Sequence, residues 1–151
     1  MLDTLTLPNQ TVTQTDAMLS ACEVELGKFF QIASRRMAAG LGKNYMPGGL
    51  IDEVWHTMLK DADRYATFSK AHAGHVLGHA ENAGFGTLAW VADYEAKFGT
   101  LDKVWFADKS GQIDSASFDE YQRTGQYVTS WDCTPDSGEQ DFDDDGSGIT
   151  A

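Results

Sequence analysis

The sequence predicts a mainly α fold, a single small helical domain of about four helices with little or no sheet. Two long stretches place apolar residues every three or four positions, as helices with one buried face do. The stretches between them are rich in glycine and polar residues, which favour turns. The 151 residues are 42% hydrophobic, which is enough for one domain with its own core.

The first expected helix covers residues 13–39. Thr13 and Asp16 stand three residues apart and resemble a capping box, with aspartate in the usual place of glutamate. Apolar residues follow at helical spacing, and Cys22 is one of them. Gly40 comes next, where a left-handed residue commonly ends a helix. Residues 1–12 are expected to form a short N-terminal arm.

The remaining elements follow from the same signals. Gly99 ends one expected helix, and Thr87 can cap its start. The glycine-rich residues 71–86 indicate loop or extended chain. Alternating side chains in residues 126–131 indicate an extended edge segment. Helices are expected at about residues 50–70, 88–98 and 117–124, within a helical domain of residues 13–135.

Charge is distributed unevenly along the chain. The formal net charge is −12, and residues 136–151 contain six acidic residues and no basic one. This acidic C-terminal tail has almost no apolar residues, so we expect it to be disordered. The moderately acidic body argues against nucleic acid as a partner. An acidic surface that imitates nucleic acid, or an acidic inhibitor, is the weakest of the functional alternatives.

Targeting and cysteine signals are sparse. No apolar run approaches the roughly 20 residues of a membrane helix. The first ten residues carry an acid and no base, unlike a signal peptide. We therefore expect a cytoplasmic protein that does not contact a membrane. The two cysteines lack a CxxC partner, which excludes a cysteine-based zinc motif. Cys22 is expected to be a buried thiol and Cys133 a bystander in a loop.

The most informative motif is DEVWH, residues 52–56. On a helix, Asp52 lies one turn before His56 at the rim of the buried face, where the two side chains can form a hydrogen bond. This pair either fastens the helix or belongs to a ligand site. One of the other histidines, His72, His75 or His79, is expected to fold back toward His56. His75 and His79 are not expected to share a metal, because extended chain separates residues four apart by roughly 13 Å.

Several motifs occur in a recognisable order: DEVWH, a tyrosine nine residues later, AGHVLGHAE, WVADYEAKFG and VWFAD. Over residues 45–131 the chain resembles small bacterial proteins that share a D-x-x-W-H helix with the glycine-rich-domain-containing proteins. Gly78 stands where relatives have the first histidine of a pair. The resemblance indicates which positions are candidates for a functional site and implies no particular activity. The matching residues, taken as the candidate functional cluster, are Asp52, Trp55, His56, Tyr65 and His79.

Two functions from different classes remain open on this basis. The first is a small acidic accessory protein that binds another protein and uses the D-x-x-W-H helix to anchor its fold. The second is a metal-binding protein or metal-dependent enzyme. Asp52, His56 and His79 would hold Zn or Fe(II), because two imidazoles and one carboxylate suit either ion. Aromatic residues at helical spacing are expected in the core: Trp55, Tyr65, Trp90, Tyr94, Phe98 and Trp105.

Overall fold

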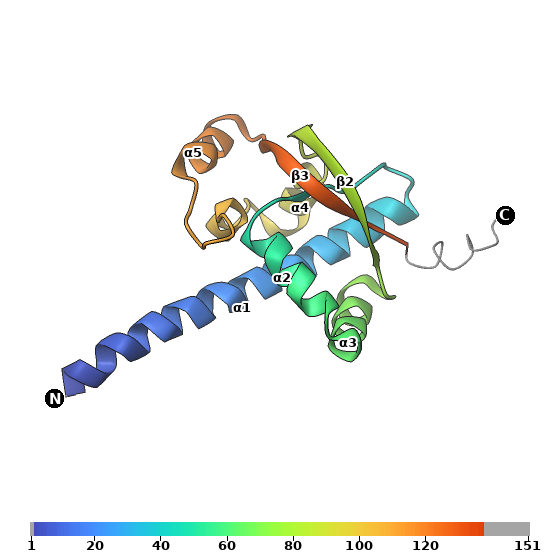
Figure 1. Ribbon diagram of the computed structural model, residues 1–151. Helices are drawn as coiled ribbons and strands as arrows, with labels where there is room; N and C mark the ends of the chain where they lie inside the picture. Colours follow the sequence, from blue (N-terminus) through green and yellow to red (C-terminus); the bar gives the residue numbers. More distant parts are fainter. Residues whose placement is uncertain (1, 138–151) are drawn as a thin grey trace.

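The computed structural model describes the backbone of residues 2–137 and the side chains of residues 15–137. Within that part of the chain, the fold consists of five α-helices, a short 3-10 helix and a three-stranded antiparallel sheet of order β1-β3-β2 (Figure 1). The prediction of a mainly α fold with little or no sheet is therefore wrong, and the fold is mixed. The elements are α1 (Leu2–Ala38), β1 (Met46–Pro47), α2 (Leu50–Leu59), α3 (Ala62–Ala73), β2 (Gly78–Thr87), α4 (Val91–Phe98), η1 (Lys103–Phe106), α5 (Ser115–Thr124) and β3 (Val128–Asp136).

Helix α1 is the longest element, and its N-terminal part projects from the body (Figure 1). It begins at Leu2, well before the expected start at residue 13. Its C-terminal half is buried on one face, at positions that recur every three or four residues. Cys22 lies on this face, as expected for a buried thiol, and is fully buried.

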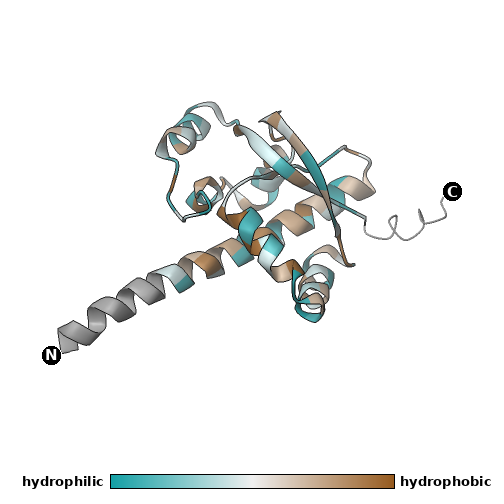
Figure 2. Ribbon diagram, viewed as in Figure 1, coloured by the Kyte–Doolittle hydropathy of each residue, from teal (hydrophilic) through white to brown (hydrophobic). Residues whose placement is uncertain are grey.

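Aromatic rings fill the centre of the core. Phe29 on α1 packs at an edge against Trp55, Trp90 and Trp105, with ring centroids 6.3, 4.9 and 6.0 Å away. All six aromatic side chains expected in the core lie there, although Phe98 is only partly buried. Figure 2 shows the apolar residues gathered on α1 and α2 where these helices meet, and a more hydrophilic sheet.

The helix expected at about residues 50–70 is two helices. α2 ends at Leu59, and α3 begins at Ala62 with Asp61 as its N-cap. The Asp61 carboxylate accepts a hydrogen bond from the backbone N–H of Arg64 at 3.2 Å. Aspartate caps a helix better than it continues one, so the chain turns there. This turn directs α3 along α1 and toward the start of β2.

The sheet was not predicted because its strands lack the usual sequence signals. β2 carries three glycines, and glycine gives no strand signal. One of them is required by packing, because a Cβ on Gly84 would lie 2.7 Å from the indole of Trp131. A register shift between Glu81 and Gly84 also interrupts the alternation of side chains. β3 was expected as an edge segment, yet it is the central strand.

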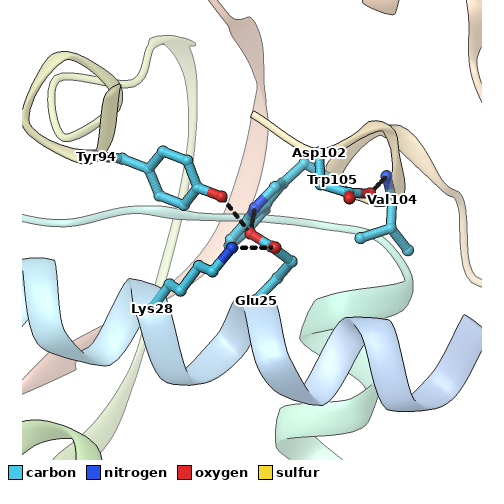
Figure 3. A network of polar contacts seen from close by, with 6 residues as sticks. All are labelled: Glu25, Lys28, Tyr94, Asp102, Val104 and Trp105. Atoms are coloured by element: carbon cyan, nitrogen blue, oxygen red, sulfur yellow. Dashed lines mark hydrogen bonds and ion pairs between the residues drawn. The ribbon is translucent and has the colours of Figure 1, made fainter. Parts of the chain in front are cut away.

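A buried carboxylate ties three elements together. Glu25 on α1 is 4% exposed, and its Oε1 accepts hydrogen bonds from the Tyr94 hydroxyl at 2.5 Å and the Trp105 indole N–H at 2.9 Å (Figure 3). The Lys28 ammonium lies 3.0 Å from Oε2. We call this set of four residues the Glu25 network. It joins α1 to α4 and η1 with every carboxylate contact supplied by a hydrogen donor.

The two ends of the chain are described only in part. The expected disordered tail, residues 136–151, lies outside the described residues apart from Asp136, which ends β3, and Ser137. Side chains of the expected arm, residues 1–12, also lie outside them. Among the described residues, no helix is both long and apolar enough to cross a membrane.

Candidate metal centre

Four side chains that bind metals converge at the junction of α2 with the sheet. Asp52 and His56 come from α2, His79 from β2 and Cys133 from β3. One ligand atom from each residue lies within 4.8 Å of all the others. We call these four residues the donor cluster. The structure therefore brings Asp52, His56 and His79 together and adds a cysteine that was expected to be a bystander in a loop.

The helical half of the cluster follows from spacing. Asp52 and His56 are four residues apart, so their side chains lie one above the other on α2. The His56 Nε2 is 3.2 Å from the Asp52 Oδ1. The Asp52 side chain is only 3% exposed, which is deeper than the rim position expected for it, whereas that of His56 is 44% exposed. The cluster therefore reaches from the interior to the surface.

The sheet half follows from strand register. Cys133 pairs with Glu81 in the ladder, and His79 stands two residues before Glu81 on β2. Residues two apart share a face of a strand, so His79 and Cys133 lie diagonally on one face of the sheet. From this face the Cys133 thiol donates to the Asp52 Oδ1 at 3.0 Å. The His79 Nε2 lies 3.2 Å from the His56 Nε2.

Burial sets the protonation of two members. It raises the pKa of the Cys133 thiol well above its usual range, and the hydrogen bond to Asp52 adds to this rise. The thiol is therefore protonated without an ion, which argues against a free cysteine nucleophile, since nucleophilic cysteines have lowered pKa values. Burial also lowers the pKa of His79, and the neighbouring His56 lowers it further. This lowering favours the neutral imidazole, the form that binds metals.

The hydrogen atoms available do not satisfy all of these contacts. The His56 Nε2 faces both the Asp52 Oδ1 and the His79 Nε2. If His56 carries a proton there, it donates to the carboxylate, and the His79 lone pair then competes for the same hydrogen. If it carries none, its lone pair faces a carboxylate oxygen. A cation among the four atoms removes this conflict, because each atom then offers it a lone pair.

The dimensions suit a small transition-metal ion. Zinc bonds of about 2.0–2.3 Å in a tetrahedron imply ligand atoms roughly 3.3–3.8 Å apart. Three of the contacts in the donor cluster measure 3.0, 3.2 and 3.2 Å, and the widest separation is bounded by 4.8 Å. Ion binding therefore needs only small adjustments, and His56 at the exposed edge is free to supply most of them.

Trp55 and Tyr65 lie behind the cluster. The Trp55 ring meets the His79 ring at its edge, with centroids 4.7 Å apart and planes at 85°. The Trp55 indole N–H donates to the Tyr65 hydroxyl at 3.3 Å. Neither residue offers a ligand atom to the cluster. Of the five residues in the candidate functional cluster, three carry ligand atoms and two support them.

Cys133 is the residue that sequence reasoning missed. It lies two positions after Trp131, just beyond the segment expected to be extended. Continuing that alternation by one step would have placed Cys133 on the same face as Trp131, but nothing in the sequence showed which strand lies beside it. No protein-family model, curated protein or solved structure matches this chain. The resemblance to glycine-rich-domain-containing proteins therefore stays a prediction.

Proposed function

We propose that this protein binds one divalent transition-metal ion, preferably Zn²⁺, through Asp52, His56, His79 and Cys133. The single observation that carries the proposal is the convergence of these four ligand atoms from α2, β2 and β3 within 4.8 Å. One thiolate, two imidazoles and one carboxylate form a donor set typical of zinc and poorly suited to Mg²⁺ or Ca²⁺, which prefer oxygen.

Cys133 also favours zinc over iron. Asp52, His56 and His79 alone would form the two-histidine, one-carboxylate set of Fe(II) enzymes, which leave coordination positions open for substrate. Cys133 supplies a fourth protein ligand beside the same carboxylate. Four protein ligands are typical of structural zinc sites, whereas catalytic sites keep one position for water. The proposed ion therefore fastens the sheet to α2, which gives the D-x-x-W-H helix the anchoring role expected for it.

Metal content measured on untagged protein tests the proposal. We expect one zinc per chain by elemental analysis and native mass spectrometry, and loss of the ion on treatment with a strong chelator. His79→Ala and Cys133→Ser should each abolish stoichiometric binding, because each removes a ligand atom. Cys22→Ser is the matched control: Cys22 is equally buried, at 0% against 1%, but contributes no ligand atom to the donor cluster.

Two results would overturn the proposal. Wild-type protein that takes up neither zinc nor cobalt in titrations would show that the cluster is only a hydrogen-bonded junction. Cys133→Ser protein that binds zinc as tightly as wild type would show that the donor set is wrong. A loss of zinc in Cys22→Ser equal to that in Cys133→Ser would trace the effect to damaged packing.

A role in binding another protein is the second candidate, and two grooves along α1 support it. One of about 530 Å³ is lined partly by Val24 and Phe68, and another of about 400 Å³ partly by Leu19 and Val54. Val24 and Leu19 are 57% and 42% exposed. Exposed apolar side chains beside grooves are features of protein-binding surfaces. Val24→Glu and Leu19→Glu should remove partners that crosslink to the wild-type protein in cells. A cytoplasmic location is likewise a proposal, which cell fractionation tests.

A further inference from the structure

Two side chains of α3 hydrogen-bond to the backbone of residues 75–77, the segment just before His79. The Tyr65 hydroxyl donates to the backbone carbonyl of Leu77 at 2.7 Å, and the Ser69 hydroxyl accepts from the backbone N–H of Leu77 at 2.8 Å. Ser69 also donates to the carbonyl of His75 at 2.8 Å. Tyr65 and Ser69 are four residues apart on α3, so both project toward the same segment. Both backbone groups of Leu77 are thus bound by side chains of one helix.

Tyr65 also forms a hydrogen bond with Trp55, whose ring packs against His79. Its hydroxyl accepts the indole N–H of Trp55 at 3.3 Å, and the edge of Trp55 contacts the His79 imidazole. Tyr65 therefore connects to His79 by two routes, through the backbone of Leu77 two residues earlier and through Trp55. Tyr65 is 5% exposed, Ser69 0% and Leu77 1%, so water does not replace these hydrogen bonds.

We propose that Tyr65 and Ser69 are positioning residues of the metal site, which hold the start of β2 and the Trp55 ring so that the His79 imidazole faces the other three ligands. The inference rests on the proposed metal-binding function and adds a second layer to it. Residues that orient a ligand without touching the ion commonly change metal affinity by about 10- to 100-fold when they are replaced. This role differs from ordinary core packing, which stabilises the protein without selecting one ligand.

The chain offers a closely matched control for Tyr65. Tyr127 is also 5% exposed, and its hydroxyl donates to a backbone carbonyl, that of Trp105, at 2.8 Å. Tyr65→Phe and Tyr127→Phe each delete one buried hydroxyl and keep the ring. We expect both variants to lose stability in urea unfolding, Tyr65→Phe somewhat more, because the Tyr65 hydroxyl also accepts from the Trp55 indole N–H. Of these two tyrosines, Tyr65 is the one that hydrogen-bonds the segment before His79, so only Tyr65→Phe of this pair should alter metal binding.

The measurement is the Kd for Co²⁺ and Zn²⁺, obtained by competition with a chromophoric chelator on full-length protein. Tyr65→Phe should weaken binding about tenfold or more, whereas Tyr127→Phe should leave the Kd unchanged. The ligand-field bands of bound Co²⁺ should shift in Tyr65→Phe, because the His79 ligand is misplaced. Thiolate-to-cobalt charge transfer from Cys133 should persist in both variants.

A serine pair provides a second test that does not depend on Tyr65. Ser69→Ala removes both Ser69 contacts to the segment before His79, whereas Ser34→Ala removes a hydroxyl that donates to the carbonyl of Ala73 at 2.9 Å, at the end of α3 and ahead of that segment. Weaker metal binding in Ser69→Ala but not in Ser34→Ala supports the positioning role.

Three outcomes have distinct meanings. Wild-type affinity in both Tyr65→Phe and Ser69→Ala would overturn the positioning role while the metal site stands. Equal weakening in Tyr65→Phe and Tyr127→Phe would also overturn it, because metal affinity would then follow overall stability. Absence of cobalt and zinc binding by the wild-type protein would instead remove the proposed function on which this inference rests.

Discussion

The protein buries two helical carboxylates in very different surroundings. Glu25 is 4% exposed and Asp52 is 2% exposed. In the Glu25 network, an ammonium, a phenol and an indole N–H all donate hydrogen bonds to the carboxylate. Asp52 receives a thiol and an imidazole nitrogen. Thiols donate weakly, and an imidazole nitrogen is as often an acceptor as a donor.

The partners of Glu25 satisfy its carboxylate within the protein, whereas the partners of Asp52 leave its carboxylate suited to bind a cation. Removing an ionised carboxylate from water is costly, so it needs compensating charge or strong hydrogen bonds. Glu25 has Lys28 as its compensating charge. Among the described residues, His56 is the ion-pair partner found for Asp52, and it is charged only if protonated. A bound cation would give Asp52 what Lys28 gives Glu25.

The largest expected effect comes from the Glu25 network. Glu25→Ala strands the buried hydrogen donors of Tyr94 and Trp105, and we expect a loss of about 3–5 kcal/mol in the free energy of unfolding. Urea denaturation measures this loss with and without zinc. The loss should be the same in both conditions, because the network has no share in the metal site. A loss that zinc restores would show that the two carboxylates are coupled.

Zinc itself should produce the next largest effect. Free zinc at about one hundred times its Kd should raise the free energy of unfolding of wild-type protein by about 2.7 kcal/mol. His79→Ala should show no such increase, since it lacks one ligand. Thermal unfolding followed by circular dichroism, with zinc or with a chelator, provides the measurement. Equal stabilisation of His79→Ala would place the zinc at another site.

Alkaline pH offers a test on two buried tyrosines, Tyr94 in the Glu25 network and Tyr65 behind the donor cluster. Burial and then Glu25 raise the pKa of Tyr94, whereas burial, with a smaller contribution from the charge of Asp136, raises the pKa of Tyr65 to about 12. A phenol whose pKa is higher in the folded state stabilises the fold below pH 10, and that stability is lost as pH rises from 10 through 12. Tyr65→Phe should lose about 2 kcal/mol less than wild type between these pH values. Identical pH profiles of the two proteins would contradict the burial argument.

The smallest expected effect is that of Asp52→Asn on the free energy of unfolding of the metal-free protein. Asp52→Asn keeps the acceptor oxygen and the shape while it removes a buried charge, so metal-free stability should change by less than about 1 kcal/mol. The same variant should bind zinc at least about tenfold more weakly, because a neutral amide is a poorer ligand. Urea unfolding in chelator and a zinc titration give the two numbers. A destabilisation as large as that of Glu25→Ala would mean that Asp52 is a structural group of the same kind.

Local patterns predicted the helices and much of the cluster. Spacing of three and four residues located the long first helix and placed Asp52 one turn from His56. Those features depend on neighbours along the chain, which a single sequence shows directly. The break at Asp61 was missed because apolar spacing continued across it, although aspartate is a strong N-cap.

Features that depend on distant pairing could not be predicted in the same way. β3 pairs with β1 and β2, segments about 40 to 90 residues earlier in the chain. Glycines and a register shift in β2 also hide the alternation that marks a strand. Cys133 is adjacent to Asp52 only because this sheet forms, so no local pattern could assign it to the cluster.

The position of Cys133 in the sequence bears on when the site can form in the cell. This ligand lies on β3, 81 residues after Asp52, and is synthesised after the other three ligands. A growing chain therefore has at most three of the four ligands until β3 leaves the ribosome. An ion held by all four residues would therefore mark a chain in which β3 has already paired with β2.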